Sequence, residues 1–279
     1  MKPVVVMQMD FGIGGGSAMY GTIKKVDPEV EVFEAHNRIE KFNLNEASRS
    51  LNNMVTYWPA GTIFVSVVDP GVGTSRRASV AKLKNGSYVV TPDNGTLTKI
   101  HETVGVEAIR VIDETRNRLK GTEKVSIFHG RDLFAYCAAK LASGIIDFEG
   151  VGPEYPVEEI VLNPEYPHSY KDGEAKGFIT DMMRMFGNLE TNIPIDDFAR
   201  AGFVSGDDVH VLIKEKDRVV VDHAIPFRTS FGYVPEGSEV VYNSSDGVIG
   251  IGINKGSFLE RYNIGIGGDW SLTITKEAK

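Results

Sequence analysis

Three aspartates, Asp10, Asp69 and Asp93, each follow a short apolar run rich in β-branched residues. Such runs predict strands buried on both faces of a parallel sheet, and ligands of these sheets bind where the strands end. A carboxylate at that edge could accept hydrogen bonds from a ribose diol. Each aspartate also begins an ordinary turn sequence, so a purely structural role stays open for each of them.

The elements that would position these aspartates alternate between strands and helices. Apolar runs predict strands, and helical spacing predicts helices. The strands are expected at 4–9, 62–68 and 88–90, and the helices from Ser17 to Lys25, from Asn43 to Val55, and from about Arg131 to an end at Gly144. Because strands separated by helices form parallel sheets, the first half predicts a helix-covered α/β domain at residues 1–165.

The second half of the chain is predicted to be β-structure. A proline-rich stretch, 152–173, indicates a connection between domains. Beyond it, Val209, Val211 and Ile213 alternate with polar residues, and residues 239–253 have the pattern of a hairpin whose turn ends in Asp-Gly. We therefore expect a smaller antiparallel β domain at residues 174–279.

Composition limits the functions that the chain could have. Its 279 residues carry 30 basic and 38 acidic side chains, and the net charge of −8 argues against binding nucleic acid or an anionic membrane. The single cysteine, Cys137, excludes an internal disulfide, and the six histidines lack the spacing of a metal site. Since no apolar run resembles a signal peptide or a membrane helix, we expect a cytoplasmic protein without a metal or other cofactor.

The loop 12–17 approximates the G-x-G-x-x-G pattern of dinucleotide-binding folds, but Ser17 stands in place of the third glycine. Asp10 lies just before this loop, where a carboxylate would repel a pyrophosphate and would suit a ribose diol instead. His129, immediately before a predicted helix, could bond a carboxylate or a water molecule. From these residues alone, we expect a nucleoside-sized site on an α/β sheet.

Five segments together resemble a known family, the S-adenosylmethionine hydroxide adenosyltransferases, which are related to the fluorinase and chlorinase enzymes. The segments are Met9–Gly12, Val67–Gly73, Pro92–Gly95, Phe128–Asp132 and Phe186–Ile193. The resemblance implies an N-terminal α/β domain and a C-terminal β-barrel-like domain. It also implies a homotrimer whose active sites lie between one subunit's N-terminal domain and a neighbour's C-terminal domain.

The family reaction is displacement of methionine from C5′ of S-adenosylmethionine by water, which yields adenosine and L-methionine. The resemblance implies three catalytic residues, Asp69, Arg76 and His129, with Arg77 as an alternative to Arg76. Asp69 would orient and polarise the water, the arginine would hold that carboxylate, and His129 would complete the hydrogen-bond network. The halogenases lack this aspartate, so Asp69 favours water over a halide.

The resemblance implies substrate-binding roles for six further residues: Asp10, Ser17, Phe42, Asn188, Phe231 and Ser244. The aspartate would bind the ribose diol, and the asparagine would contact the adenine. The two aromatic rings would stack on faces of the nucleoside, although packing in the core stays open for both of them.

Two positions depart from the family pattern where the methionine half of the substrate should bind. Gly15 stands where the family often has an acid, and Met183 stands where an aspartate usually precedes Phe-Gly-Asn, while Asp181 is displaced by two or three residues. Because an ammonium group needs such acceptors, we expect S-adenosylmethionine to gain little affinity over adenosine. Two alternatives therefore stay open: another 5′-substituted adenosine as the substrate, or a nucleoside-binding protein without turnover.

Overall fold

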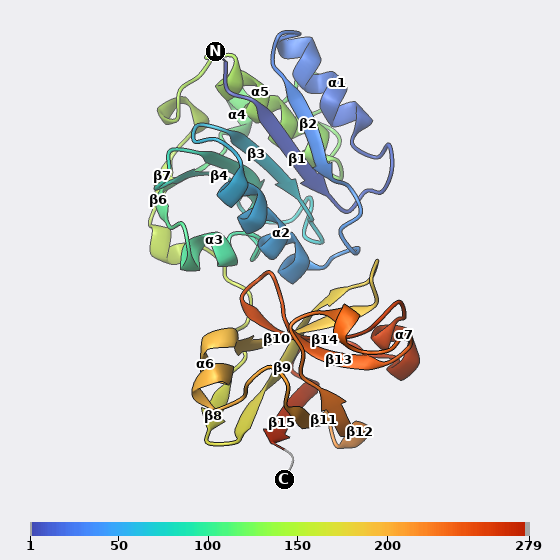
Figure 1. Cartoon of the computed structure of the whole chain (residues 1–279). Helices are drawn as coiled ribbons and strands as arrows, with labels where there is room; N and C mark the ends of the chain where they lie inside the picture. Colours follow the sequence, from blue (N-terminus) through green and yellow to red (C-terminus); the bar gives the residue numbers. More distant parts are fainter. Residues whose placement is uncertain (1, 277–279) are drawn as a thin grey trace. The chain divides into compact units, whose positions relative to one another are not determined.

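The computed structural model describes residues 2–276. The chain divides into two compact units, Met1–Asn163 and Pro164–Lys279 (Figure 1). The first unit is a sheet covered by helices on both faces, and the second is built mainly from antiparallel strands.

The sheet of the first unit has the strand order β2-β1-β3-β5-β4-β6-β7. Its strands are β1 (Val5–Met9), β2 (Val32–His36), β3 (Ile63–Val67), β4 (Ala78–Leu83), β5 (Tyr88–Pro92), β6 (Val106–Val111) and β7 (Glu154–Tyr155). The pairs from β2 to β5 are parallel, whereas β4, β6 and β7 pair in antiparallel fashion. The predicted α/β fold is confirmed, with a sheet that is mixed rather than wholly parallel.

The antiparallel part of the sheet begins at a tight turn between β4 and β5. Gly86 adopts a positive φ of 85°, a conformation that glycine enters without steric cost. The preceding Asn85 accepts a hydrogen bond from the Ser87 backbone N–H at 3.0 Å. Asn-Gly is a common sequence for such turns, and it reverses the chain so that β4 lies antiparallel to β5.

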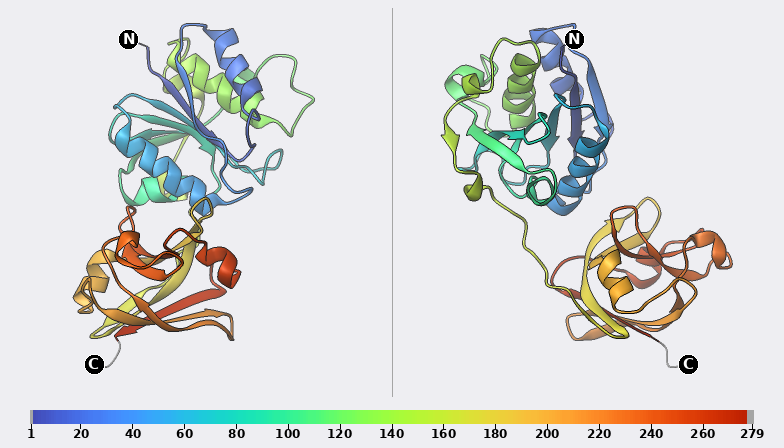
Figure 2. Two further views of the ribbon diagram at one scale, coloured as in Figure 1. Left: turned by 45° about the vertical axis from the view of Figure 1, so that its right-hand side comes forward. Right: turned by 60° about the vertical axis from the view of Figure 1, so that its left-hand side comes forward.

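Helices cover both faces of this sheet. They are α1 (Ser17–Val26), α2 (Leu44–Tyr57), α3 (Thr98–Glu102), α4 (Glu114–Asn117), a π-helix η1 (Gly130–Ala135), α5 (Tyr136–Ala142) and two 3-10 turns, η2 (Glu149–Val151) and η3 (Val157–Glu159). The helices α1, η1 and α5 lie on one face of the sheet, and α2 and α3 lie on the other (Figure 2). Their apolar side chains pack against the sheet on the two faces. Asn43 caps the start of α2, since its side chain accepts from the Glu46 N–H at 3.0 Å.

The second unit is a nearly closed antiparallel sheet with the order β12-β11-β15-β9-β10-β14-β13. Its strands are β8 (Ser169–Lys171, paired with β9), β9 (Glu174–Met183), β10 (Asn188–Pro194), β11 (Asp208–Glu215), β12 (Arg218–Pro226), β13 (Glu239–Asn243), β14 (Val248–Ile253) and β15 (Trp270–Lys276). A bridge between Phe227 and Val241 brings the end of β12 beside β13, which gives the sheet its barrel-like form. The predicted hairpin of β13 and β14 is confirmed, with Gly247 in the turn at φ 79°.

Short helices complete the second unit: α6 (Ile195–Arg200), the 3-10 turn η4 (Phe231–Tyr233) and α7 (Phe258–Tyr262). Its core is a continuous apolar cluster, to which alternate residues of each long strand contribute. In β14, for example, Ile249, Ile251 and Ile253 are buried in this cluster, so Gly250 and Gly252 face the opposite side. None of the helices in residues 2–276 has the length and apolarity needed to cross a bilayer.

Candidate active site

The three aspartates that follow the apolar runs lie at the ends of neighbouring strands. β1, β3 and β5 are adjacent and parallel, so Asp10, Asp69 and Asp93 follow strand ends along one edge of the sheet. Asp93 is buried, and its carboxylate accepts hydrogen bonds from Arg77 Nε at 3.0 Å, the Tyr155 hydroxyl at 3.1 Å and a backbone N–H. These bonds occupy the carboxylate within the fold, so the structural interpretation holds for Asp93.

Asp69, which follows the end of β3, belongs to a network of three side chains. Arg76 Nε donates to both carboxylate oxygens of Asp69, at 3.0 and 3.1 Å, and Arg76 Nη2 lies 2.9 Å from His129 Nδ1. The guanidinium also stacks over the ring of Phe134, 5.3 Å from its centroid. Arg77 bonds Asp93 and Glu159 instead, so the structure brings Arg76 and not Arg77 to Asp69.

The network fixes the protonation state of the histidine. A guanidinium can only donate, so Nδ1 of His129 accepts and the ring proton resides on Nε2. Burial, and then the positive charge of Arg76, lower the pKa of His129 below its ordinary value of 6.5. At neutral pH, His129 is therefore an uncharged ring whose Nε2–H can donate to a water molecule or a ligand.

A close backbone approach brings the histidine segment to the arginine segment. Gly73, between β3 and β4, has a φ of 78°, and a Cβ there would lie 2.9 Å from the carbonyl oxygen of Ser126. Only glycine fits both this conformation and this contact. The loop that carries Arg76 thus packs against the loop that leads into His129.

A pocket of about 340 Å³ opens beside the network, lined by Asp10, Phe42, Asp69 and His129 among others. Asp10 Oδ2 accepts from the Phe42 backbone N–H at 3.0 Å. Phe42 is 65% exposed and has a φ of 66°, which is rare for an aromatic residue, so packing in the core does not explain its position. The exposed ring beside a carboxylate is suited to a planar ligand with a diol.

The glycine-rich loop is not arranged for a pyrophosphate. A Cβ on Gly16 would lie 2.6 Å from Oε2 of Glu34, so this loop has a carboxylate beside it as well as Asp10 before it. A Cβ on Gly15 would lie 2.7 Å from the backbone oxygen of Phe11, so the glycine at that position is needed by the backbone itself. Ser17 is exposed at the first position of α1 and lines neither of the two pockets described here.

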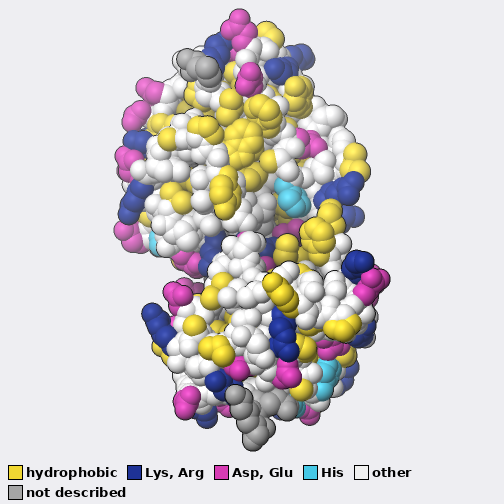
Figure 3. Space-filling view, viewed as in Figure 1, with side chains coloured by type: hydrophobic (Ala, Val, Ile, Leu, Met, Phe, Trp, Pro, Cys, Tyr) yellow, Lys and Arg dark blue, Asp and Glu magenta, His cyan; other side chains and the backbone are white. Residues whose placement is uncertain are grey.

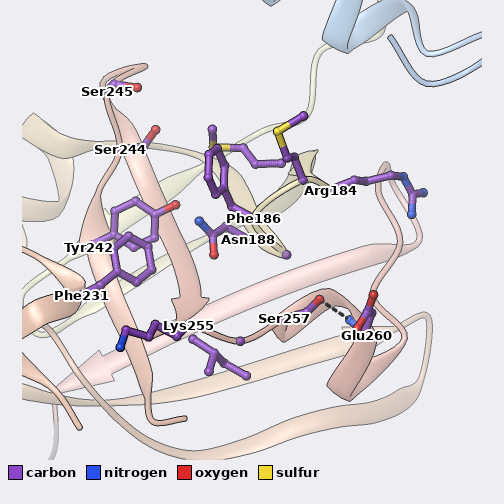
Figure 4. Close-up of a pocket in the computed structure, with 15 residues that line it drawn as sticks. Arg184, Phe186, Asn188, Phe231, Tyr242, Ser244, Ser245, Lys255, Ser257 and Glu260 are labelled. Carbon is purple, nitrogen blue, oxygen red and sulfur yellow. Dashed lines mark hydrogen bonds between the residues drawn. The ribbon is translucent and has the colours of Figure 1, made fainter. Parts of the chain in front are cut away.

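A second and larger pocket, of about 840 Å³, lies in the second unit (Figure 4). Asn188, Phe231 and Ser244 line it, and so do two residues that sequence reasoning missed, Tyr242 and Lys255. The rings of Phe231 and Tyr242 lie 4.7 Å apart and Asn188 lies beside them, as Figure 4 shows. The glycines that alternate with isoleucines in β14 are the sequence signal that could have located this pocket.

The two glycines of β14 make room for two side chains that line the pocket, Asn188 and Tyr242. A Cβ on Gly252 would collide with the amide oxygen of Asn188, and one on Gly250 would lie 2.6 Å from Cζ of Tyr242. Asn188 is buried, and its Oδ1 has no hydrogen-bond partner among residues 2–276. A buried acceptor without a donor is uncommon in folded proteins, and here it lies at a pocket.

The predicted site residues therefore divide between the two units. The first unit holds Asp10, Phe42, Asp69, Arg76 and His129, and the second holds Asn188, Phe231 and Ser244. The first pocket is lined by the Asp69 carboxylate and the neutral His129 ring, both bonded to the Arg76 guanidinium, and these two groups can orient a water molecule. The second combines aromatic rings with amide and hydroxyl groups, which can hold a heteroaromatic base.

Comparison with known proteins supports one family for the whole chain. The curated (R)-S-adenosyl-L-methionine hydrolase of Thermus thermophilus is 32% identical over 93% of this chain and 95% of its own length. A fluorinase of Actinopolyspora mzabensis is 24% identical over 99% of this chain and 98% of its own. The crystal structure of an uncharacterized conserved protein from Thermotoga maritima, 31% identical, superposes with a TM-score of 0.85 over 98% of this chain and all of that one.

Models of the two domains of one family also match this sequence. The S-adenosylmethionine hydroxide adenosyltransferase N-terminal domain matches residues 5–152, and the C-terminal domain matches residues 184–271. The first range contains the Asp69–Arg76–His129 network, and the second contains all but one of the residues that line the second pocket. The chain belongs to the S-adenosylmethionine hydroxide adenosyltransferase family.

Proposed function

We propose that this protein hydrolyses S-adenosyl-L-methionine at C5′ to adenosine and L-methionine. The observation that carries the proposal is the network in which Arg76 holds the Asp69 carboxylate and a neutral His129 at the wall of a pocket. A relative named (R)-S-adenosyl-L-methionine hydrolase, aligned over most of both chains, supports it. The network favours an enzyme over a nucleoside-binding protein, because simple binding needs no group that polarises water.

The chemistry requires little beyond positioning. The water oxygen forms a bond to C5′, the C5′–S bond breaks, and its electron pair stays on sulfur as the neutral thioether of methionine. Asp69 accepts a hydrogen bond from the attacking water and aligns it with the C5′–S bond, and the released proton passes to solvent. Arg76 fixes the carboxylate and balances its charge, while Nε2–H of His129 donates to the same water network. Because the sulfonium leaves as a neutral group, we propose that no cofactor is needed.

Residues of both pockets would bind the nucleoside. Asp10 retains lone pairs beyond the one that Phe42 N–H uses, so it can accept both hydroxyls of a ribose. The exposed ring of Phe42 and the ring of Phe231 would stack on the nucleoside, and the amide of Asn188 would contact the base. Ser17 is not among the residues that line either pocket, and its role in binding stays a prediction.

Hydrolysis in ¹⁸O-labelled water tests the proposed reaction. If water attacks C5′, the protein should convert S-adenosylmethionine to adenosine that carries one ¹⁸O atom at its 5′-hydroxyl, with unlabelled methionine released in equal amount. Liquid chromatography with mass spectrometry measures both products. A parallel reaction with added fluoride or chloride should give the same adenosine and no halogenated nucleoside. Unlabelled adenosine, or S-adenosylmethionine left intact, would contradict the proposal.

We propose that the complete site forms between subunits of a homotrimer, with the first pocket of one subunit facing the second pocket of a neighbour. The chemistry supports such an arrangement, because one pocket has the water-orienting groups and the other the groups for a base. Hydrophobic side chains also gather over β2 and α2 (Figure 3). There Tyr57 is 86% exposed and Phe33, on the edge strand β2, packs 5.2 Å from Trp58.

If the protein is a homotrimer, multi-angle light scattering should give a molar mass three times the 30.6 kDa mass of the chain. Substitution of Tyr57 by lysine should shift the protein toward smaller species, because a charge in a buried interface is unfavourable. A monomer that hydrolyses S-adenosylmethionine at the wild-type rate would contradict the shared site.

We also propose a cytoplasmic location, which a chain with a single, buried cysteine favours.

A further inference from the structure

The segment Pro92–Gly95 contains one polar side chain, that of Asn94, which the arrangement described so far does not use. Asn94 follows β5 and is half-buried, and it is not among the residues that line either pocket. Its Nδ2 donates a hydrogen bond to the backbone oxygen of Val68 at 2.9 Å. Val68 directly precedes Asp69, so the side chain of Asn94 reaches from one strand end to the backbone of the next.

This hydrogen bond lies beyond the last residue of β3. The register of β3 with β5 ends at Val65 and Val90, and β3 itself ends at Val67. A backbone oxygen inside a fold needs a donor, and the donor for Val68 is a side chain instead of a neighbouring strand. Asn94 therefore continues the connection between the two strand ends as far as the peptide unit that leads into the aspartate.

The bond restrains the direction of the Asp69 side chain. The carbonyl oxygen of Val68 belongs to the same planar peptide unit as the backbone nitrogen and Cα of Asp69. A bond that holds this oxygen limits the rotation of the plane, and so limits the direction in which the side chain leaves the backbone. Arg76 holds the other end, since its Nε donates to both carboxylate oxygens. Asp69 is thus restrained at its backbone as well as at its carboxylate.

The amide group of Asn94 has its own orientation fixed. Its Oδ1 accepts from the hydroxyl of Thr96 at 2.9 Å and from the Thr96 backbone N–H at 3.4 Å. Thr96 is fully buried. Because these two donors face the oxygen of the amide, its NH₂ group is the part that faces Val68.

The loop that carries Asn94 is held by the last residues of the first unit. Gly95 forms a parallel bridge with Leu162, and its φ of 111° is a conformation that glycine adopts without strain. A Cβ on Gly95 would collide with Oδ1 of Asn163. The Asn163 N–H in turn donates to the hydroxyl oxygen of Thr98 at 2.8 Å. Asn94 therefore holds Val68 from a well-supported loop.

We propose that Asn94 is a positioning residue for hydrolysis: by holding the Val68 carbonyl, it directs the Asp69 carboxylate toward the attacking water. The proposal rests on the function proposed above, because the water that Asp69 aligns belongs to that reaction. Displacement of a reacting group by about 1 Å can lower a rate about 10²-fold, so one amide outside the pocket can control turnover. Since Asn94 does not line either pocket, its loss should lower kcat and leave KM nearly unchanged.

Two substitutions separate the bond to Val68 from the bonds to Thr96. Asn94→Ala removes both without adding a charge. Asn94→Asp keeps the acceptor for Thr96 and replaces the donor with an oxygen that the Val68 carbonyl repels. Steady-state assays of adenosine formation should show kcat lowered about 10- to 100-fold in both variants, with KM nearly unchanged. A wild-type kcat in either variant would overturn the proposal.

A double variant distinguishes positioning of Asp69 from a general effect on the fold. Asp69→Ala/Asn94→Ala should be no slower than Asp69→Ala, because Asn94 acts through a carboxylate that is already absent. Rate losses that multiply would show that Asn94 acts elsewhere, and would overturn the proposal. If Asn94→Ala does not fold, Asn94→Asp takes its place in this comparison.

Asn192 offers a matched control in the second unit. Its half-buried amide donates to the backbone oxygen of Tyr166 at 2.5 Å and accepts from the Phe178 N–H at 2.7 Å, and it lines neither pocket. Asn192→Ala should lower the midpoint of thermal unfolding and leave kcat near the wild-type value. An equal loss of kcat in Asn192→Ala and Asn94→Ala would overturn the proposal alone. A wild-type protein that forms no adenosine would overturn the proposed function and this proposal with it.

Discussion

Replacing Asp69 by alanine should lower the rate of S-adenosylmethionine hydrolysis by about 10²- to 10⁴-fold, the usual range for a side chain that acts on the proton of the nucleophile. The reason is that the water loses the acceptor that aligns it with C5′, and Arg76 loses the carboxylate that it holds at 3.0 Å. Affinity for adenosine should change little, because Asp10, on the neighbouring strand, provides the acceptors for the ribose. Single-turnover kinetics and adenosine titration measure the two effects separately.

The matched control is Asp93→Asn, at the end of the next strand. Asp93 accepts from Arg77, Tyr155 and a backbone N–H, all within the fold. Its substitution should therefore lower the midpoint of thermal unfolding and leave the hydrolysis rate of the folded enzyme nearly unchanged. If Asp69→Ala hydrolyses the substrate at the wild-type rate, Asp69 is a turn residue as Asp93 is.

The sequence predicts the location of the first pocket because parallel strands impose it. Three apolar runs that each end in aspartate place their carboxylates along one edge once the runs form neighbouring strands. The role of each aspartate depends on partners far away in the sequence, such as Tyr155 for Asp93 and Phe42 for Asp10. Local pattern cannot distinguish these roles, since all three aspartates begin similar turns.

Neighbours in the sequence can also have different partners in space. Arg76 and Arg77 are adjacent and have the same side chain, so the sequence cannot distinguish them. The chain enters β4 at Ala78, and the two arginines reach different carboxylates, those of Asp69 and Asp93. Gly15 is a similar case. In the sequence it stands where the family often has an acid, but in the structure a side chain at this position would collide with Phe11. In both cases, the deciding fact is backbone conformation.

The second pocket was the less predictable part. Its wall depends on the register of four strands, which places Glu190 beside Asp181, Gly250 and Ser244. Register over such distances follows from turns and packing that no single motif encodes. The alternation of glycine and isoleucine in β14 was the local sign, since the glycines make room for the side chains of Asn188 and Tyr242, which line the pocket.

Replacing Arg76 by glutamine should be the second most damaging change, with the hydrolysis rate lowered about 10²-fold, as when one preorganised donor is lost. The variant leaves the buried Asp69 carboxylate without its two hydrogen bonds from Nε and leaves His129 Nδ1 without its donor. Because the two side chains of this ion pair are only 10% and 5% exposed, the free energy of unfolding should also fall by about 3–5 kcal/mol. Timed assays of adenosine formation measure the hydrolysis rate, and chemical denaturation measures the free energy of unfolding.

Arg77→Gln separates the catalytic effect of Arg76→Gln from a general loss of charge. Arg77 bonds Asp93 and Glu159, so its substitution should destabilise the fold while the rate stays near that of the wild type. The double variant Asp69→Ala/Arg76→Gln should be no slower than Asp69→Ala alone, because residues that act as one unit have non-additive effects. If the two rate losses multiply, Arg76 acts on the substrate independently of Asp69, and its role in holding that carboxylate is wrong.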